Sequence, residues 1–143
     1  MTIDLALKLT RIIPAAPERV FDAWLTPALM TRFLHGHPEH SVTNAESEAR
    51  VGGAFRVVMN DGIKDIPHWG VYREVDRPRR LVFTWNSPHA VPDSVVELDF
   101  RAVPGGTEVT LGHDRFPSEG SRDGHEKGWT CILDQLGRML ETA

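Results

Sequence analysis

The segment 125–140, close to the C-terminus, constrains the fold of this chain more than any other stretch. Its large apolar residues recur three or four positions apart, which places them on one face of a helix. They are Trp129, Ile132, Leu133, Leu136 and Leu140. Almost everything before this segment has the alternating apolar and polar residues of short strands. A long amphipathic helix that follows a series of strands buries its apolar face against the sheet, so the sequence predicts an α+β fold.

The rest of the chain predicts one strand, two short helices and about six further strands. Apolar residues alternate from Ile3 to Leu9, which indicates the first strand. Pro17 and Pro27 suit the first position of the two short helices. The later strands are expected near residues 47–51, 55–59, 68–75, 81–85, 96–100 and 107–113, with loops at 35–44 and 116–124.

These strands follow one another with short turns between them. Such strands form an antiparallel meander, and a strongly twisted meander curls. We therefore expect a curved antiparallel sheet of about six to seven strands wrapped around the long C-terminal helix. The two short helices come after the first strand, and residues 1–143 form a single domain.

Composition and charge bear on the compartment and on the partners. The net charge is −4, and lysine and arginine are scattered along the chain, which argues against nucleic acid as a partner. No stretch approaches the roughly 18 apolar residues of a membrane helix, and the N-terminus lacks the pattern of a signal peptide. We therefore expect a cytoplasmic protein without membrane insertion. The one cysteine, Cys131, leaves no internal disulfide possible.

The concave face of the sheet is the first candidate for a binding site, because one helix seldom fills a wide curved surface. A pocket there would be mainly apolar, with a few polar groups. The alternative is a packed core without a cavity, which large aromatic side chains favour because each buries roughly 150–250 Å². The candidate lining residues are Trp24, Phe33, Phe55, Val57, Phe83, Trp85, Leu98, Phe100, Leu111, Trp129, Leu133 and Leu136, with His113 and His125 as polar contacts at one end.

Three titratable residues near this face are weaker candidates for catalysis. His113 is in phase with the inward residues of the last strand, and His125 stands at the start of the final helix. Each histidine could act as an acid or base near neutral pH, or could instead bond a backbone carbonyl and orient the intervening loop. Glu74 would be a buried acid with a raised pKa on a concave face, and a solvated carboxylate on a convex one.

A histidine-rich segment follows the two short helices. His35, His37 and His40, together with Glu39, are side chains of the types that bind zinc. Their spacing matches no known signature, so they are weak metal candidates, and a polar loop beside the pocket entrance is the alternative. The sequence has no phosphate-binding glycine loop and no nucleophile elbow, and we expect no cofactor.

Motifs spread over nearly the whole length resemble one known family. They are Arg11 with 16–21 and Trp24, Pro27, Gly52-Gly53 with Phe55, 70–75, 81–85, 105–111 with His113, and His125 with Gly128-Trp129 and Leu133. In their order and spacing, these motifs resemble the family named after the activator of the heat-shock-protein-90 ATPase. This family lies within the SRPBCC/START-like superfamily of helix-grip folds, which also includes the Bet v allergens.

The resemblance implies a curved sheet that grips the C-terminal helix, with a cavity between them. Members commonly bind hydrophobic small molecules, and relatives in the superfamily include aromatase/cyclases and lipid carriers. The leading hypothesis is therefore binding of a small aromatic or lipid-like ligand without catalysis. The alternatives are a cyclase, dehydratase or hydrolase that uses the same pocket, and a chaperone-activating interaction module. The sequence pattern leaves open whether the protein is a monomer or a homodimer.

Overall fold

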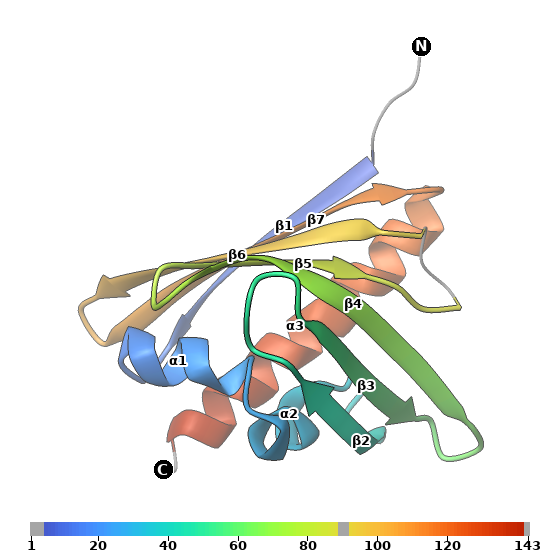
Figure 1. Ribbon diagram of the computed structural model, residues 1–143, viewed down its shortest axis with the longest axis horizontal. Helices are drawn as coiled ribbons and strands as arrows, with labels where there is room; N and C mark the ends of the chain where they lie inside the picture. The colour runs from blue at the N-terminus through green and yellow to red at the C-terminus, as the bar shows by residue number, and fades with distance from the viewer. Residues whose placement is uncertain (1–4, 89–91, 142–143) are drawn as a thin grey trace.

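The computed structural model describes residues 5–88 and 92–141, so Ile3 of the predicted first strand lies outside it. It confirms the α+β fold, with a curved antiparallel sheet of seven strands, two short helices after the first strand and a long C-terminal helix (Figure 1). The elements are β1 Leu5–Ile13, α1 Pro17–Ala23, α2 Pro27–Phe33, β2 Ser41–Ser47, β3 Ala54–Asn60, β4 Asp65–Asp76, β5 Arg80–Trp85, β6 Ser94–Val103, β7 Gly106–Phe116 and α3 Glu119–Glu141.

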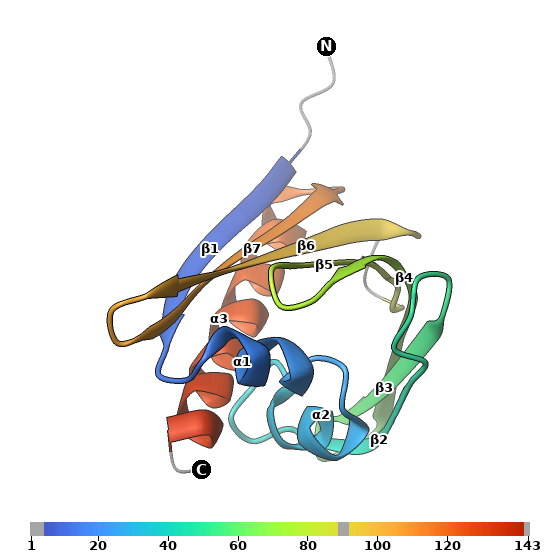
Figure 2. The ribbon, with the colours of Figure 1, turned by 60° about the vertical axis from the view of Figure 1, so that its left-hand side comes forward.

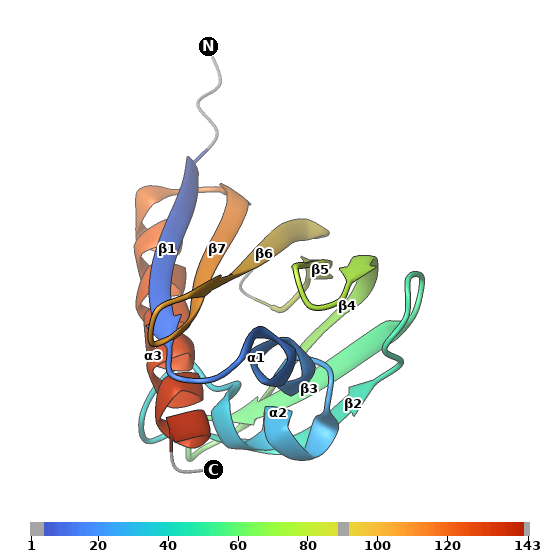
Figure 3. The ribbon, with the colours of Figure 1, turned by 90° about the vertical axis from the view of Figure 1, so that its left-hand side faces the viewer.

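The sheet has the strand order β1-β7-β6-β5-β4-β3-β2, and every neighbouring pair is antiparallel. Strands β2 to β7 are the predicted meander, whereas β1 crosses to the far edge and pairs with β7. The sheet curls strongly from β1 round to β2, and α1 and α2 lie across its open side (Figure 3). The concave face is therefore covered by helices from two different parts of the chain.

Helix α3 does not run along the middle of the concave face. It packs chiefly against β1 at one edge of the sheet and against α2 (Figure 2). The side chain of Gln135 joins α3 to the end of α2, since its Nε2 donates hydrogen bonds to the carbonyl oxygens of Phe33 (3.2 Å) and His35 (2.8 Å). Helices α1 and α2 thus fill the concavity beside the C-terminal half of α3, and they leave its N-terminal half facing β3, β4 and β5 without an intervening helix.

The C-terminal helix begins earlier than the sequence analysis predicted. The segment 116–124 was expected to be a loop, but α3 starts at Glu119. Gly120 and Gly124 lower the helix propensity of this segment, which hides it from a pattern search. The sequence did contain a start signal, because the hydroxyl oxygen of Ser118 accepts a hydrogen bond from the backbone N–H of Ser121 (3.1 Å), as an N-terminal capping serine does.

The second strand also differs from its predicted position. A weak strand was expected at 47–51 after a loop at 35–44, but β2 spans Ser41–Ser47. This strand forms the edge of the sheet, and only Val42, Ala45 and Ser47 among its residues are even half-buried. An edge strand that is exposed on most of its surface lacks the apolar alternation on which the prediction depended.

Among the described residues, no helix is long and apolar enough to cross a membrane.

Candidate functional site

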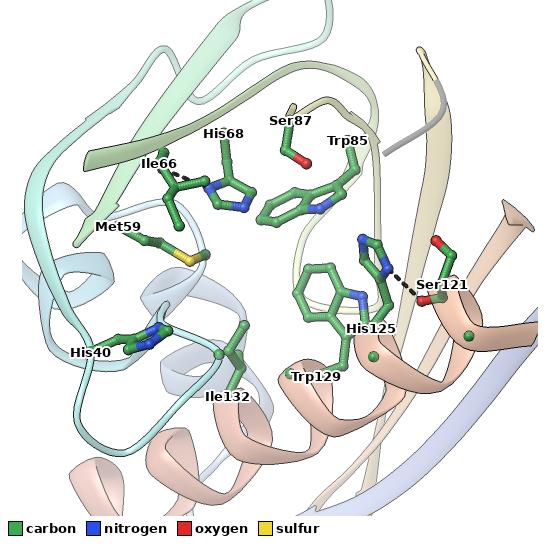
Figure 4. Close-up of a pocket in the computed structure, with 14 residues that line it drawn as sticks. His40, Met59, Ile66, His68, Trp85, Ser87, Ser121, His125, Trp129 and Ile132 are labelled. Atoms are coloured by element: carbon green, nitrogen blue, oxygen red, sulfur yellow. Dashed lines mark hydrogen bonds between the residues drawn. The ribbon is translucent and has the colours of Figure 1, made fainter. Parts of the chain in front are cut away.

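A pocket of about 500 Å³ lies where α3 faces the strands without an intervening helix (Figure 4). Its lining comes from the N-terminal half of α3, from β3, β4 and β5, and from the segment after α2. The lining residues are Gly36, His40, Met59, Ile66, His68, Trp85, Ser87, Gly120, Ser121, Gly124, His125, Gly128, Trp129 and Ile132. The sheet and the helix thus border an open pocket of ligand size at one end of the molecule.

Two tryptophans form the inner wall of this pocket. Trp85 ends β5 and Trp129 lies on α3, and their ring centroids are 4.8 Å apart at an interplanar angle of 54°. The imidazole of His68 lies beside Trp85, with centroids 5.0 Å apart, and its Nδ1 donates a hydrogen bond to the Ile66 carbonyl (3.1 Å). Together these rings make a wall that is largely aromatic.

Glycines form part of the helical wall. Gly120, Gly124 and Gly128 are four residues apart, so they share one face of α3, and all three line the pocket. A Cβ atom at Gly124 would meet nothing within 4 Å, whereas one at Gly36 would lie only 3.2 Å from the Cα of Gly128. The bare face of α3 therefore leaves open space beside Gly124 and lets the backbone at Gly36 approach Gly128 closely.

His113 lies behind the tryptophan wall, where it is 2% exposed. Trp129 Nε1, which can only donate, donates a hydrogen bond to His113 Nδ1 (3.1 Å). His113 Nε2 must therefore carry the proton, and it donates to the hydroxyl oxygen of Ser94 (2.8 Å), whose own proton goes to the carbonyl of Trp85 (2.9 Å). Burial, with a smaller contribution from the neighbouring His125, lowers the pKa of His113 from 6.5 to about 3.

This chain of hydrogen bonds changes the interpretation of His113. The side chain points inward as predicted, but both ring nitrogens are occupied and the ring stays neutral near pH 7. It does not line the pocket. It connects the side chain of one wall tryptophan to the backbone of the other, and so holds the wall in place.

His125 lies on the pocket side of the same cluster. Its ring is half-buried between Phe116 (centroids 4.9 Å apart) and His113 (5.4 Å), and it projects from α3 beside Trp129 (Figure 4). Nδ1 is 2.8 Å from the carbonyl oxygen of Ser121, one turn earlier in α3. The sequence predicts His125 as a polar contact at one end of the pocket, and the structure places its side chain in the lining.

Most of the other predicted ligand contacts are core residues. Of the fourteen, only Trp85, Trp129 and His125 line the 500 Å³ pocket. The apolar residues that do not line it are at most 6% exposed. They are Trp24, Phe33, Phe55, Val57, Phe83, Leu98, Phe100, Leu111, Leu133 and Leu136. The alternative of a packed core therefore describes the region beside α1 and α2, where the void that Trp24, Phe55 and Phe83 help to line measures only about 10 Å³.

Glu74 lies on the convex side of the sheet. The register of β4 against β5 shifts between Tyr72 and Glu74, which is a β-bulge, and the bulge breaks the alternation that would have put both side chains on one face. Tyr72 is buried, but Glu74 is exposed and forms an ion pair with Arg80 (3.1 Å). The structure thus gives the convex, solvated alternative for Glu74.

The histidine-rich segment does not gather around one point. His35 is buried with its Nδ1 2.9 Å from the carbonyl oxygen of His37, and His37 Nδ1 accepts a hydrogen bond from the backbone N–H of Glu39 (3.1 Å). His40 alone of the three lines the pocket. In the described part of the chain, no group of three or more histidine, cysteine, aspartate or glutamate side chains is placed to hold a metal ion.

Several lining residues were missed by the sequence analysis. Met59 and Ile132 lie within the predicted strand 55–59 and the predicted helix 125–140, and Ile66 and Ser87 lie just outside the predicted strands. The four-residue spacing of the α3 glycines was a usable signal, because three glycines on one face of a helix leave that face bare. The predicted loop at 116–124 hid this spacing, since two of the three glycines lie in that segment.

Comparisons with known proteins agree with this architecture. Residues 14–141 match the family model described as Activator of Hsp90 ATPase homolog 1-like protein. A search of curated proteins finds no significant match. A protein from Chromobacterium violaceum superposes with a TM-score of 0.86 at 23% identity, over 95% of this chain and 97% of that one, which shows the shared fold.

Two further structures are similar at slightly higher identity. The AHSA1-like protein from Aeromonas hydrophila has a TM-score of 0.82 and 26% identity, over 96% of this chain and 93% of that one. The AHSA1 protein from Silicibacter pomeroyi has a TM-score of 0.81 and 25% identity, over 96% and 99%. The family match and the helix-grip-like fold are consistent with the SRPBCC superfamily. The chain belongs to the family of Activator of Hsp90 ATPase homolog 1-like proteins.

Proposed function

We propose that this protein binds a small, mainly apolar, aromatic ligand in the pocket between the curved sheet and the N-terminal half of α3. The observation that carries the proposal is the pocket of about 500 Å³ with Trp85 and Trp129 side by side in its wall. Its volume lies within the range of roughly 300–1,000 Å³ that is typical of ligand sites. Aromatic rings gain favourable contacts with other aromatic rings beyond the area that they bury.

The hydrogen bonds behind the wall support the proposal. Trp129 is held by His113, and His113 is held through Ser94 to the backbone of Trp85. A wall that is ordered before the ligand arrives loses less conformational entropy on binding than one that must be ordered by it. The buried hydrogen-bond network therefore favours a site that is preorganised for ligand binding.

Catalysis by His113 and Glu74 is not supported by their positions. His113 is buried, has both ring nitrogens bonded and has a pKa near 3. Glu74 is on the outer face, paired with Arg80. A general acid or base must reach the substrate within hydrogen-bond distance, and neither side chain lines the pocket.

The test is a titration with 2-methoxynaphthalene, an uncharged bicyclic aromatic, followed by calorimetry and by tryptophan fluorescence. The wild type should bind with 1:1 stoichiometry and with a change in emission from the wall tryptophans. The blocking variant is Gly124→Leu, because the new side chain enters the open space of the pocket and replaces a poor helix former by a good one. It should fold at least as stably as the wild type and should lose binding.

The matched control is Gly137→Leu, the same exchange later in the same helix. A Cβ there meets only the end of the Ile13 side chain, at 3.7 Å, and Gly137 does not line the pocket. This variant should keep the wild-type affinity. The absence of binding to the wild type, or equal binding to Gly124→Leu and wild type, would show that the pocket is not the ligand site.

A further inference from the structure

The hydrogen bond between His125 and the Ser121 carbonyl decides which ring nitrogen of His125 is free to face a ligand. Nδ1 lies 2.8 Å from the Ser121 carbonyl oxygen, and a carbonyl oxygen only accepts, so Nδ1 carries the proton of the neutral ring. Nε2 is then left with a lone pair. The contacts with Phe116 and His113 hold the ring plane, and Figure 4 shows the ring directed from α3 toward Trp85.

The side chains of the described residues in the pocket lining are uncharged apart from its imidazoles, which can titrate. None of its described lining residues is an aspartate, glutamate, lysine or arginine. The polar groups in the lining are imidazoles, serine hydroxyls and backbone. A ligand carboxylate would give up its water here without gaining a lysine or arginine partner, which is unfavourable. A neutral ligand does not meet this penalty.

We propose that His125 Nε2 is the hydrogen-bond acceptor of the site and that it selects uncharged hydroxylated aromatic ligands, with phenols and naphthols as the simplest examples. The aromatic body lies against Trp85 and Trp129, and its hydroxyl group donates to Nε2. A ligand without a donor would strip water from Nε2 and leave it unpaired, which costs affinity. This inference rests on the proposed function, since it assigns the polar contact within the same pocket.

The test compares three ligands with one ring system at about pH 8, where naphthol is still neutral and naphthoate is ionised. They are 2-naphthol, 2-methoxynaphthalene and 2-naphthoate, titrated by calorimetry into wild type and His125→Phe. The measured quantity is the ratio of the dissociation constant of the ether to that of the naphthol. This ratio cancels the difference in water solubility when the two proteins are compared.

The ratio should fall by about 2- to 10-fold in His125→Phe, which is the fold-change that one net hydrogen bond produces. The matched control is His40→Phe, at another imidazole of the lining, and it should leave the ratio unchanged. In the wild type, 2-naphthoate should bind more weakly than 2-naphthol.

Two kinds of result would overturn the inference and leave the proposed function intact. One is binding of the ether with an ether-to-naphthol ratio that is the same in wild type and His125→Phe, or that falls in His40→Phe and not in His125→Phe. The other is tighter binding of naphthoate than of naphthol. If none of the three ligands binds to the wild type, the proposed function fails as well.

Discussion

Trp129 donates its indole N–H to Nδ1 of His113 at 3.1 Å, and this single bond settles the protonation of a buried histidine. Because an indole cannot accept, the imidazole must be the Nε2–H tautomer. A proton added to Nδ1 would break the bond to Trp129 and place a charge in a site that is 2% exposed. Protonation of His113 would therefore both destabilise the fold at acid pH and release Trp129 from its place in the pocket wall.

The stability should fall with pH in a defined window because of His113. The unfolded chain takes up the proton near pH 6.5, whereas the folded protein takes it up only near pH 3. Between these values the unfolded state binds more protons, so the free energy of unfolding should fall by about 1.4 kcal/mol per pH unit as the pH falls. The stabilisation is complete above pH 6.5, since His113 is then neutral in both states.

Urea unfolding of wild type and His113→Gln at several pH values between 5 and 7 would measure this effect. Glutamine does not titrate and offers both a donor and an acceptor, so the difference between the two proteins isolates the imidazole. The difference in unfolding free energy should change with the predicted slope below about pH 6. Parallel pH profiles for the two proteins would contradict the assignment.

Two tryptophans should respond differently to the same substitution. Trp24 and Trp129 are 3% and 2% exposed, but Trp24 Nε1 has no hydrogen-bond partner among the described residues, whereas Trp129 Nε1 bonds His113. Trp24→Phe removes an unpaired buried donor, and Trp129→Phe leaves a buried acceptor unpaired. The free energy of unfolding should therefore drop more in Trp129→Phe, by about 1–3 kcal/mol. Similar losses in chemical denaturation would refute the difference.

Overpacking should distinguish the solid part of the interior from the pocket. Leu133 is fully buried and does not line the 500 Å³ pocket. Leu133→Trp should lower the free energy of unfolding by about 1–3 kcal/mol through strain. Gly124→Leu should show no such loss, because it enters open space. Thermal unfolding of the two variants beside wild type is the measurement, and equal destabilisation would mean that the pocket region is as densely packed as the core.

Two strand glycines should differ sharply in their tolerance of a methyl group. A Cβ at Gly70 in β4 would overlap the carbonyl oxygen of Thr84 and the Phe55 ring, whereas a Cβ at Gly112 in β7 meets nothing within 4 Å. Gly70→Ala should therefore cost about 3 kcal/mol or more. Gly112→Ala should be neutral or stabilising by about 0.5 kcal/mol. Urea denaturation of both variants checks the pair, and a mild effect at Gly70 would contradict this packing.

Local patterns predicted the elements that bury one clear face. The α3 stripe from Trp129 to Leu140 and the alternation in β6 and β7 were visible because burial on one side repeats with the period of the element. The elements that were misplaced lack this signature. Strand β2 is an exposed edge, and the first turns of α3 carry glycines where a core-facing helix would carry leucines.

The candidate site was predicted less well, for a geometric reason. Sequence phase says which side chains point inward, and Trp85, Trp129, His113 and His125 do so. It does not say how far one inward face lies from another. That distance depends on α3 leaning toward β1 and on α1 and α2 filling the opposite half of the concavity.

The order and type of most elements, and hence the fold class, could be predicted from the residue pattern, because periodic burial is a local property of the chain. The tertiary structure alone decided where the core ends and the pocket begins. It also decided that a bulge turns Glu74 outward, and that His113 supports the wall while His125 faces the space. These features arise from contacts between residues far apart in the chain, and hydrogen-bond partners and voids exist only once those residues meet.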